Sequence, residues 1–315
     1  MTQQPPPVPN PYGPPVPAQP APHGPPPSGV PAAPPGPVGP PPGWRPPPRK
    51  KQPDAEPGRF TWWDLGATLF YVLGFLTGLV GLLALLPPIN ELIIGDEAQA
   101  QQATFVINAV GYGLLSVIAI VLSGAALWRS IKAFSYLWWL KLLLVPVAWV
   151  VSIVLNLVIV VLIFGSTGET SENQEAIEAM LQAVPLLAAV AVIGILGPYV
   201  EEYFFRHLLI GKLSKYLSIW ICAAISVLAF PLIHFIPALL GMADDLTFIS
   251  VVPYLTMGMV ITVGYILSGR NLFYAWVLHA FNNVMSLLLA YFLVPWLGEY
   301  AGELHGALWL ASLLG

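Results

Sequence analysis

Long apolar runs separated by short polar segments fill the chain from residue 62 onward. A bilayer core requires about 20 residues of helix, and each run is long enough to cross it. The expected spans are 62–86, 104–127, 138–165, 182–208, 217–240, 248–268 and 271–294. The apolar end, 306–315, is too short to cross alone and fits either a re-entrant piece or the tail of a short eighth helix. The pattern predicts an all-α, polytopic membrane helical bundle of seven spans, plus an eighth in the second case.

Composition supports this class, because 57% of the residues are hydrophobic and only 9% are charged. Soluble domains carry roughly 25% charged residues. Residues 1–60 differ from the rest and hold most of the chain's 34 prolines. Such a segment cannot bury enough apolar surface to fold, so a disordered proline-rich tail is expected. A docking site for a proline-recognising domain is the alternative.

Charge distribution predicts the orientation. If the spans alternate from a cytoplasmic tail, all 12 Lys and Arg residues fall on the cytoplasmic side and the opposite loops carry only acids. The basic residues are Arg45, Arg49, Lys50, Lys51, Arg59, Arg129, Lys132, Lys141, Arg206, Lys212, Lys215 and Arg270. The chain is therefore expected in the plasma membrane with its N-terminus in the cytoplasm. The cluster Arg49-Lys50-Lys51 with Arg59 is assigned to an anionic membrane surface, and no nucleic-acid partner is expected.

Two adjacent glutamates interrupt the fourth apolar run, and Arg206 follows one turn later. Ionisable groups at membrane depth are unfavourable and usually mark a functional interior. Glu202 and Arg206 are four residues apart on one helix face, which favours an ion pair. Glu201 points about 100° away. We expect Glu202–Arg206 to be a structural pair and Glu201 to be a general base. Both acids in one buried ion network is the alternative.

Later spans add His234, one turn after Phe230, and His279, one turn before Asn283. Taken singly, each histidine is equally explained by a hydrogen bond to a neighbouring helix. Together with Glu201 they would supply a base, an imidazole that orients water (His234) and two oxyanion donors (His279 and Asn283). These groups suit amide hydrolysis through a tetrahedral intermediate. Alternatively, Glu201, His234 and His279 would hold Zn²⁺ together with water.

The sequence resembles the CPBP (CAAX protease and bacteriocin-processing, or Abi) intramembrane proteases, which include the type II CAAX prenyl endopeptidases. The motifs that carry the resemblance are Glu201-Glu202-x-x-x-Arg206, Phe230-x-x-x-His234 and His279-x-x-x-Asn283. The resemblance implies that Glu201 and His234 activate water, and that His279 and Asn283 stabilise the oxyanion. It also implies a glutamic endopeptidase without a cofactor, although family names often say metalloprotease. A membrane-associated peptide or protein would be the substrate.

The resemblance divides the chain into four parts. These are a tail (1–60), N-terminal helices (61–181), a CPBP-like catalytic core (182–294) and a C-terminal segment (295–315). The site is expected to open toward the cytoplasmic half. If span five starts at 217, however, His234 lies about 26 Å along it, deeper than Glu201. Either 212–221 runs along the surface, or the prolines break the helix. His207 is expected at the membrane interface.

Two other classes use the same residues. A proton-coupled transporter would use the glutamates and histidines as a proton relay, but such carriers often show internal repeats, and no convincing period appears. A non-catalytic binding or immunity protein would place a partner in the same cavity. Motifs of site-2-type metalloproteases, aspartyl intramembrane proteases and Gly-x-Ser-x-Gly hydrolases are absent from the sequence.

Overall fold

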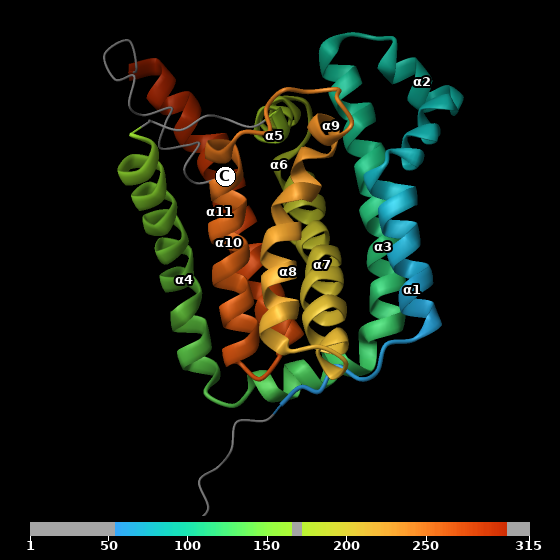
Figure 1. Cartoon of the computed structure of the whole chain (residues 1–315). Helices are drawn as coiled ribbons and strands as arrows, with labels where there is room; N and C mark the ends of the chain where they lie inside the picture. Colours follow the sequence, from blue (N-terminus) through green and yellow to red (C-terminus); the bar gives the residue numbers. More distant parts are fainter. Residues whose placement is uncertain (1–53, 166–171, 301–315) are drawn as a thin grey trace, which may run out of the picture. The chain divides into compact units, whose positions relative to one another are not determined.

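The computed structural model describes residues 54–165 and 172–300, and all regular structure in these ranges is helical (Figure 1). Six helices are long and apolar enough to cross a membrane, and a bent pair of helices would make a seventh span. The predicted all-α, multi-pass class is therefore confirmed for the described residues. The count of seven stays a prediction, while the proposed eighth helix and the tail as far as residue 53 lie outside the described ranges.

The first predicted span is a bent pair of helices rather than one straight helix. It comprises α1 (Trp62–Leu69), η1 (Phe70–Leu76) and η2 (Leu79–Leu85), with a 51° bend between its two halves. Gly78 lies at the bend with φ +81°, a left-handed conformation that glycine adopts without a steric penalty. The short α2 (Pro87–Ile93) follows.

The second span, α3 (Glu97–Phe134), is longer at both ends than the predicted 104–127. A capping box extends its start, because the Asp96 side chain accepts a hydrogen bond from the backbone of Gln99 at 2.8 Å. Its end is stabilised by Lys141, whose Nζ donates to the carbonyl oxygen of Ala133 at 2.8 Å. Lys141 lies in α4 (Trp138–Ile159), which continues into η3 (Val160–Phe164).

The fourth predicted span also extends further than expected and runs without interruption from Leu186 to Lys215. Its segments are α6 (Leu186–Ala189), η4 (Val190–Leu196), α7 (Gly197–Glu202), η5 (Tyr203–Lys212) and η6 (Leu213–Lys215). The winding changes from wide π-type turns to a regular α-helix at Gly197, directly before Pro198. Proline cannot donate the usual backbone bond, and π-type turns are frequent at functional sites.

The greater length of the fourth helix explains how His234 and Glu201 can lie at a similar depth in the bundle. Because the helix continues to Lys215, Glu201 lies about 21 Å from its end, whereas the predicted end at 208 placed it much closer. His234 lies at a similar distance from the start of α8 (Ile219–Leu232). The prolines also break this span, since η7 (Ile233–Phe235) and α9 (Ile236–Leu239) replace the regular helix.

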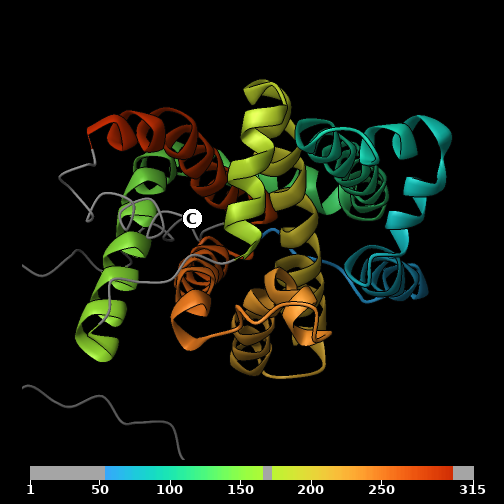
Figure 2. The ribbon, with the colours of Figure 1, turned by 90° about the horizontal axis from the view of Figure 1, so that it is seen from above.

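The remaining helices complete the bundle. They are α5 (Glu172–Ala183), α10 (Phe248–Leu267) and α11 (Leu272–Tyr300). The helix α10 packs against α8, α4 and α11, and α11 packs against η4 and α7. In the view from above, α5 crosses the middle of the bundle (Figure 2). The segment that carries both glutamates therefore has neighbouring helices on several sides.

Two polar residues of the fourth predicted span are buried inside the bundle. Arg206, assigned to the cytoplasmic side, has no exposed surface and lies within the fourth span. His207, expected at the interface, is only 1% exposed and stacks on Tyr203 with 5.8 Å between ring centroids. Both side chains are enclosed by the bundle because the helix continues beyond 208, and their depth in a membrane stays a prediction. Residues 54–60, predicted as part of the tail, contact the bundle through a hydrogen bond from Ala55 to Gly269.

Candidate active site

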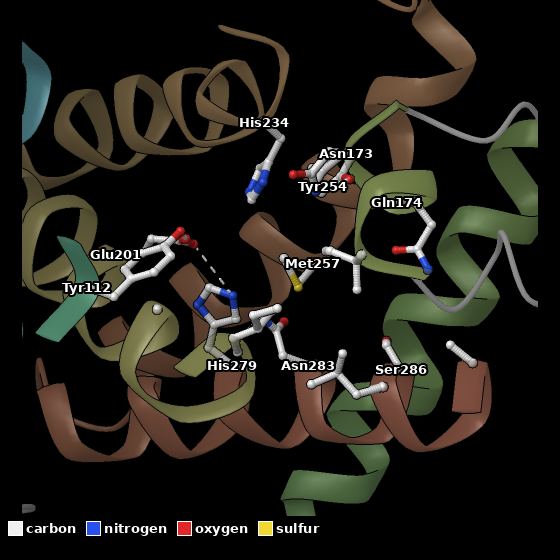
Figure 3. A pocket seen from close by; sticks show the side chains of 15 residues that line it. Tyr112, Asn173, Gln174, Glu201, His234, Tyr254, Met257, His279, Asn283 and Ser286 are labelled. Carbon is white, nitrogen blue, oxygen red and sulfur yellow. Dashed lines mark hydrogen bonds and ion pairs between the residues drawn. The ribbon is translucent and has the colours of Figure 1, made fainter. Parts of the chain in front are cut away.

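A cavity of about 80 Å³ lies among the helices that carry the predicted site residues (Figure 3). Glu201, His234, His279 and Asn283 all line it. A buried water needs roughly 10–15 Å³ of such space, so the cavity has room for several waters. Four residues from three separate spans therefore meet at one hollow, as their motifs predicted.

The Glu202–Arg206 pair does not line this cavity but contacts it through His279. Arg206 Nη1 is 3.0 Å from Glu202 Oε1, and neither side chain has exposed surface. Arg206 also donates from Nη2 to the backbone oxygen of Gly258 at 3.0 Å. Its guanidinium lies 4.5 Å from the centroid of the Phe230 ring. The predicted ion pair is thus present, and Phe230 contributes a cation–π contact to it.

Glu201 points to a different face and is 4% exposed. Its Oε1 accepts a long hydrogen bond of 3.5 Å from the Tyr112 hydroxyl. Its Oε2 has no hydrogen-bond partner among the described residues. Buried carboxylate oxygens are normally hydrogen-bonded. An oxygen left without a protein partner beside a water-sized cavity is placed to accept a hydrogen bond from water.

His279 lies between the two glutamates. Its Nδ1 is 2.8 Å from Glu202 Oε1, and its Nε2 is 3.7 Å from Glu201 Oε2 (Figure 3). The Nε2 atom has no hydrogen-bond partner within the described ranges. A carboxylate on one ring nitrogen fixes the orientation of the imidazole and leaves the other nitrogen for chemistry. Glu202 is therefore both the partner of Arg206 and the anchor of His279, and the sequence analysis missed the second contact.

His234 is held by aromatic rings. It stacks on Tyr254, with centroids 4.2 Å apart and planes inclined by 19°. The Phe230 ring presents its edge to His234 at 5.4 Å and to His279 at 5.6 Å. His234 Nε2 is buried and has no hydrogen-bond partner in the described part of the chain. The ring is thus fixed by packing, while one nitrogen remains for a small molecule in the cavity.

Asn283 lies one turn beyond His279 on α11. Its Nδ2 donates to the backbone oxygen of Ile193 in η4 at 3.3 Å. A carboxamide nitrogen carries two hydrogens, so the second can donate to another acceptor. The bond to Ile193 fixes the direction of the group. Asn283 and His279 both line the same cavity.

The sequence analysis missed three contributors to the site. Tyr112 donates to Glu201, Tyr254 stacks on His234, and Asn173 in α5 donates to the Tyr254 hydroxyl at 3.1 Å. Tyrosines inside otherwise apolar spans were the available signal, but lipid-facing and packing tyrosines give the same pattern. Asn173 lies in α5, before the fourth span, and no sequence motif marked it.

The zinc alternative requires Glu201, His234 and His279 to meet at one ion. Within residues 54–165 and 172–300, no group of three His, Cys, Asp or Glu side chains could hold a metal ion. His279 already contacts Glu202 through Nδ1, and His234 is stacked on Tyr254. The side chains as placed do not form a metal site, so the reaction proposed for this cavity assigns no role to a metal.

The cavity extends toward one end of the bundle. The sequence analysis placed the opening toward the basic, cytoplasmic half. Three of the lining residues, Asn173, Gln174 and Ile177, belong to α5. That helix lies at the end of the bundle opposite the segment that precedes α1 (Figure 1). The cavity therefore extends toward the end whose charged residues, within the described ranges, are acidic.

Comparisons with known proteins cover the same region. No curated protein and no solved structure matches the chain. A sequence model of one family matches residues 183–285, about a third of the chain, which include all three motifs. The family is described as "Type II CAAX prenyl endopeptidase Rce1-like". Over residues 183–285 the predicted resemblance is therefore confirmed, and this part of the chain is similar to the Rce1-like type II CAAX prenyl endopeptidases.

Proposed function

We propose that the chain is an intramembrane endopeptidase that hydrolyses a peptide bond with water activated by Glu201. The observation that carries the proposal is the pair of facing atoms Glu201 Oε2 and His279 Nε2. They lie 3.7 Å apart beside the cavity, and neither has a hydrogen-bond partner in the described ranges. The family match to Rce1-like endopeptidases supports the same reaction class.

In the proposed reaction, a water molecule occupies the cavity between Glu201 and His234. The carboxylate of Glu201 accepts one proton as the water oxygen attacks the carbonyl carbon of the scissile bond. His234 Nε2 accepts a hydrogen bond from the same water and orients it. Its stacking on Tyr254 holds the ring in place. Such positioning removes much of the entropic part of the barrier.

The tetrahedral intermediate carries negative charge on the former carbonyl oxygen. We assign the stabilisation of this oxyanion to His279 and Asn283. In the imidazolium form both nitrogens of His279 donate, Nδ1 to Glu202 and Nε2 toward the cavity. The second N–H of Asn283 is the other donor. Glu201 then gives its proton to the leaving amine, which restores the carboxylate and completes the hydrolysis.

The substrate in this proposal is a peptide or protein segment at the membrane. The family description names prenyl endopeptidases, but no residue of this chain identifies a prenyl group as part of the substrate. The proposed location is the plasma membrane with a cytoplasmic N-terminus, because the basic residues cluster on one side. Binding of the proline-rich tail by a proline-recognising protein is likewise a proposal.

Quantitative proteomics of new peptide termini tests the function. Membranes from cells that express the wild-type chain are compared with membranes that contain Glu201→Ala at matched level. A terminus that appears only with the wild type supports proteolysis and identifies the substrate. Equal termini, with the variant folded and the cell phenotype unchanged, would instead favour a transporter or a binding protein.

A further inference from the structure

The cavity lies closer to one end of the bundle than to the other. Its lining includes residues of α5 and of the α5-side half of α10, whereas no residue of the opposite end contributes. The hydroxyl of Tyr254, in the second turn of α10, accepts a hydrogen bond from Asn173 and so connects α10 with α5. A substrate segment that enters from the α5 end would meet Glu201 and His279 directly.

The opposite end is rich in basic residues. Contacts there connect the start of α1 with η5 (Asp64 to Lys212, 2.8 Å) and the end of α3 with the start of α4 (Lys141 to Ala133). The described basic residues at this end are Arg59, Arg129, Lys132, Lys141, Lys212, Lys215 and Arg270. Arg206 is the exception in the described ranges, and it is neutralised by Glu202.

The α5 end of the bundle carries negatively charged residues instead. It includes α5 itself, the start of α3, which donates from Gln102 to Ala183, and the loop before α10. Its charged residues within the described ranges include Glu91, Asp96, Glu97, Glu175, Glu178, Asp244 and Asp245. Basic residues remain on the cytoplasmic side of membrane proteins, whereas acids contribute little to orientation. The charge difference therefore assigns the α5 end to the non-cytoplasmic face.

We propose that the cavity is reached from the non-cytoplasmic face, past α5, and that its substrate is a polypeptide segment exposed on that face. That a substrate enters the cavity rests on the proposed function, whereas the side from which the cavity is reached does not. The sequence analysis expected the opposite, with the cavity opening toward the cytoplasmic half.

The carboxylates at this face also define the chemistry of the segment. Gln174 lines the cavity and donates from Nε2 to Glu178 at 3.1 Å, so one carboxylate lies directly beside the lining. Glu175 is exposed on the same helix. Negative charges at the mouth of a low-dielectric cavity raise the local concentration of positively charged groups. The segment is therefore one with Lys or Arg next to the cleaved bond.

Cysteine labelling tests the access side without any need for activity. The single cysteine, Cys222, is buried and is replaced by Ser. Two exposed positions then receive a reporter in the full chain, Glu175→Cys on α5 and Lys215→Cys at the basic end. Intact cells are treated with a membrane-impermeant maleimide. We expect labelling of Glu175→Cys in intact cells, and of Lys215→Cys only after permeabilisation.

The reverse labelling pattern would overturn the access side, and so would labelling of both positions in intact cells. Neither result would affect the proposed proteolysis, which depends on Glu201. Conversely, a chain that labels as expected but yields no new termini would retain its sidedness and lose its proposed function. The two proposals therefore fail separately.

Charge reversal on α5 tests the substrate chemistry. Full-length protein in liposomes is given two peptides that differ only in Lys or Glu next to the cleaved bond. Glu175→Lys with Glu178→Lys should lower the Lys-to-Glu cleavage ratio at least about tenfold. Glu91→Lys, at the same end but on α2, is the control and should leave the ratio unchanged. A ratio that the double variant does not change would refute the charge preference, and a folding defect alone would not alter it.

Discussion

Glu202 Oε1 lies 2.8 Å from His279 Nδ1, so the second glutamate of the pair anchors the histidine of the last motif. The same oxygen is 3.0 Å from Arg206 Nη1. One buried carboxylate thus connects α7 to α11 and also neutralises the arginine of its own helix. This double role separates the two adjacent acids more clearly than their spacing does.

The double role gives a test with two separable outcomes. Glu202→Gln should destabilise the protein by about 3–5 kcal/mol, because it leaves Arg206 buried without its counter-charge. Adding Arg206→Met should restore most of the stability but no activity, since the neutral amide cannot balance the positive charge that the proposed reaction places on His279. Thermal unfolding in detergent and peptide cleavage measure the two effects. Recovery of cleavage in the double variant would show that Glu202 acts only as a counter-ion.

Tyr254 should control the position of His234. Tyr254→Phe keeps a ring at 4.2 Å from the imidazole and removes only the hydroxyl that Asn173 contacts, so cleavage should fall little. Tyr254→Leu removes the stacked ring and should lower kcat by about tenfold, because the proposed water-orienting group loses its fixed position. Steady-state kinetics with a fluorogenic peptide would distinguish them. Equal activity of the two variants would argue against a positioning role for the ring.

A second buried ion pair holds the first span against the catalytic helix. Lys212 Nζ is 2.8 Å from both carboxylate oxygens of Asp64, and Tyr203 donates to the same group at 3.0 Å. Lys212→Met should destabilise by about 3–5 kcal/mol, and Asp64→Asn with Lys212→Met should be close to the wild type. Melting temperatures in detergent measure this. A stable Lys212→Met variant would mean that water reaches Asp64.

Metal removal should leave cleavage unchanged, because no group of three ligand side chains in the described ranges could hold a metal ion. The purified protein is incubated with a strong zinc chelator and assayed with a peptide. Unchanged activity agrees with catalysis by Glu201 and water. Loss of activity that Zn²⁺ restores would establish the metalloprotease alternative, with Glu201, His234 and His279 as ligands after rearrangement.

Sequence reasoning predicted the helices and the central residues because the signals were strong. A glutamate pair, two histidines and an asparagine stand out against apolar spans, and helical spacing alone predicted the Glu202–Arg206 contact. The structure brings all four candidate catalytic residues to one cavity. Their catalytic roles stay predictions until cleavage is measured.

Helix ends were less predictable, for physical reasons. Hydropathy does not separate a buried polar turn from a loop, so the fourth span was ended near Arg206, although a buried ion pair and the Asp64–Lys212 contact allow it to continue to Lys215. The contribution of α5 depends on tertiary contacts of Asn173 and Gln174, which leave no periodic pattern in the sequence. The access side of the cavity depends on these features.

The most direct test of the central claim is cleavage by purified Glu201→Gln. This change keeps the shape of the side chain and removes only its ability to accept a proton. The account predicts a loss of activity of about 10²- to 10⁴-fold with an unchanged melting temperature. Glu91→Gln, the same change at an exposed position on α2, should remain fully active. Substantial cleavage by a folded Glu201→Gln variant would contradict the claim that this carboxylate activates the water.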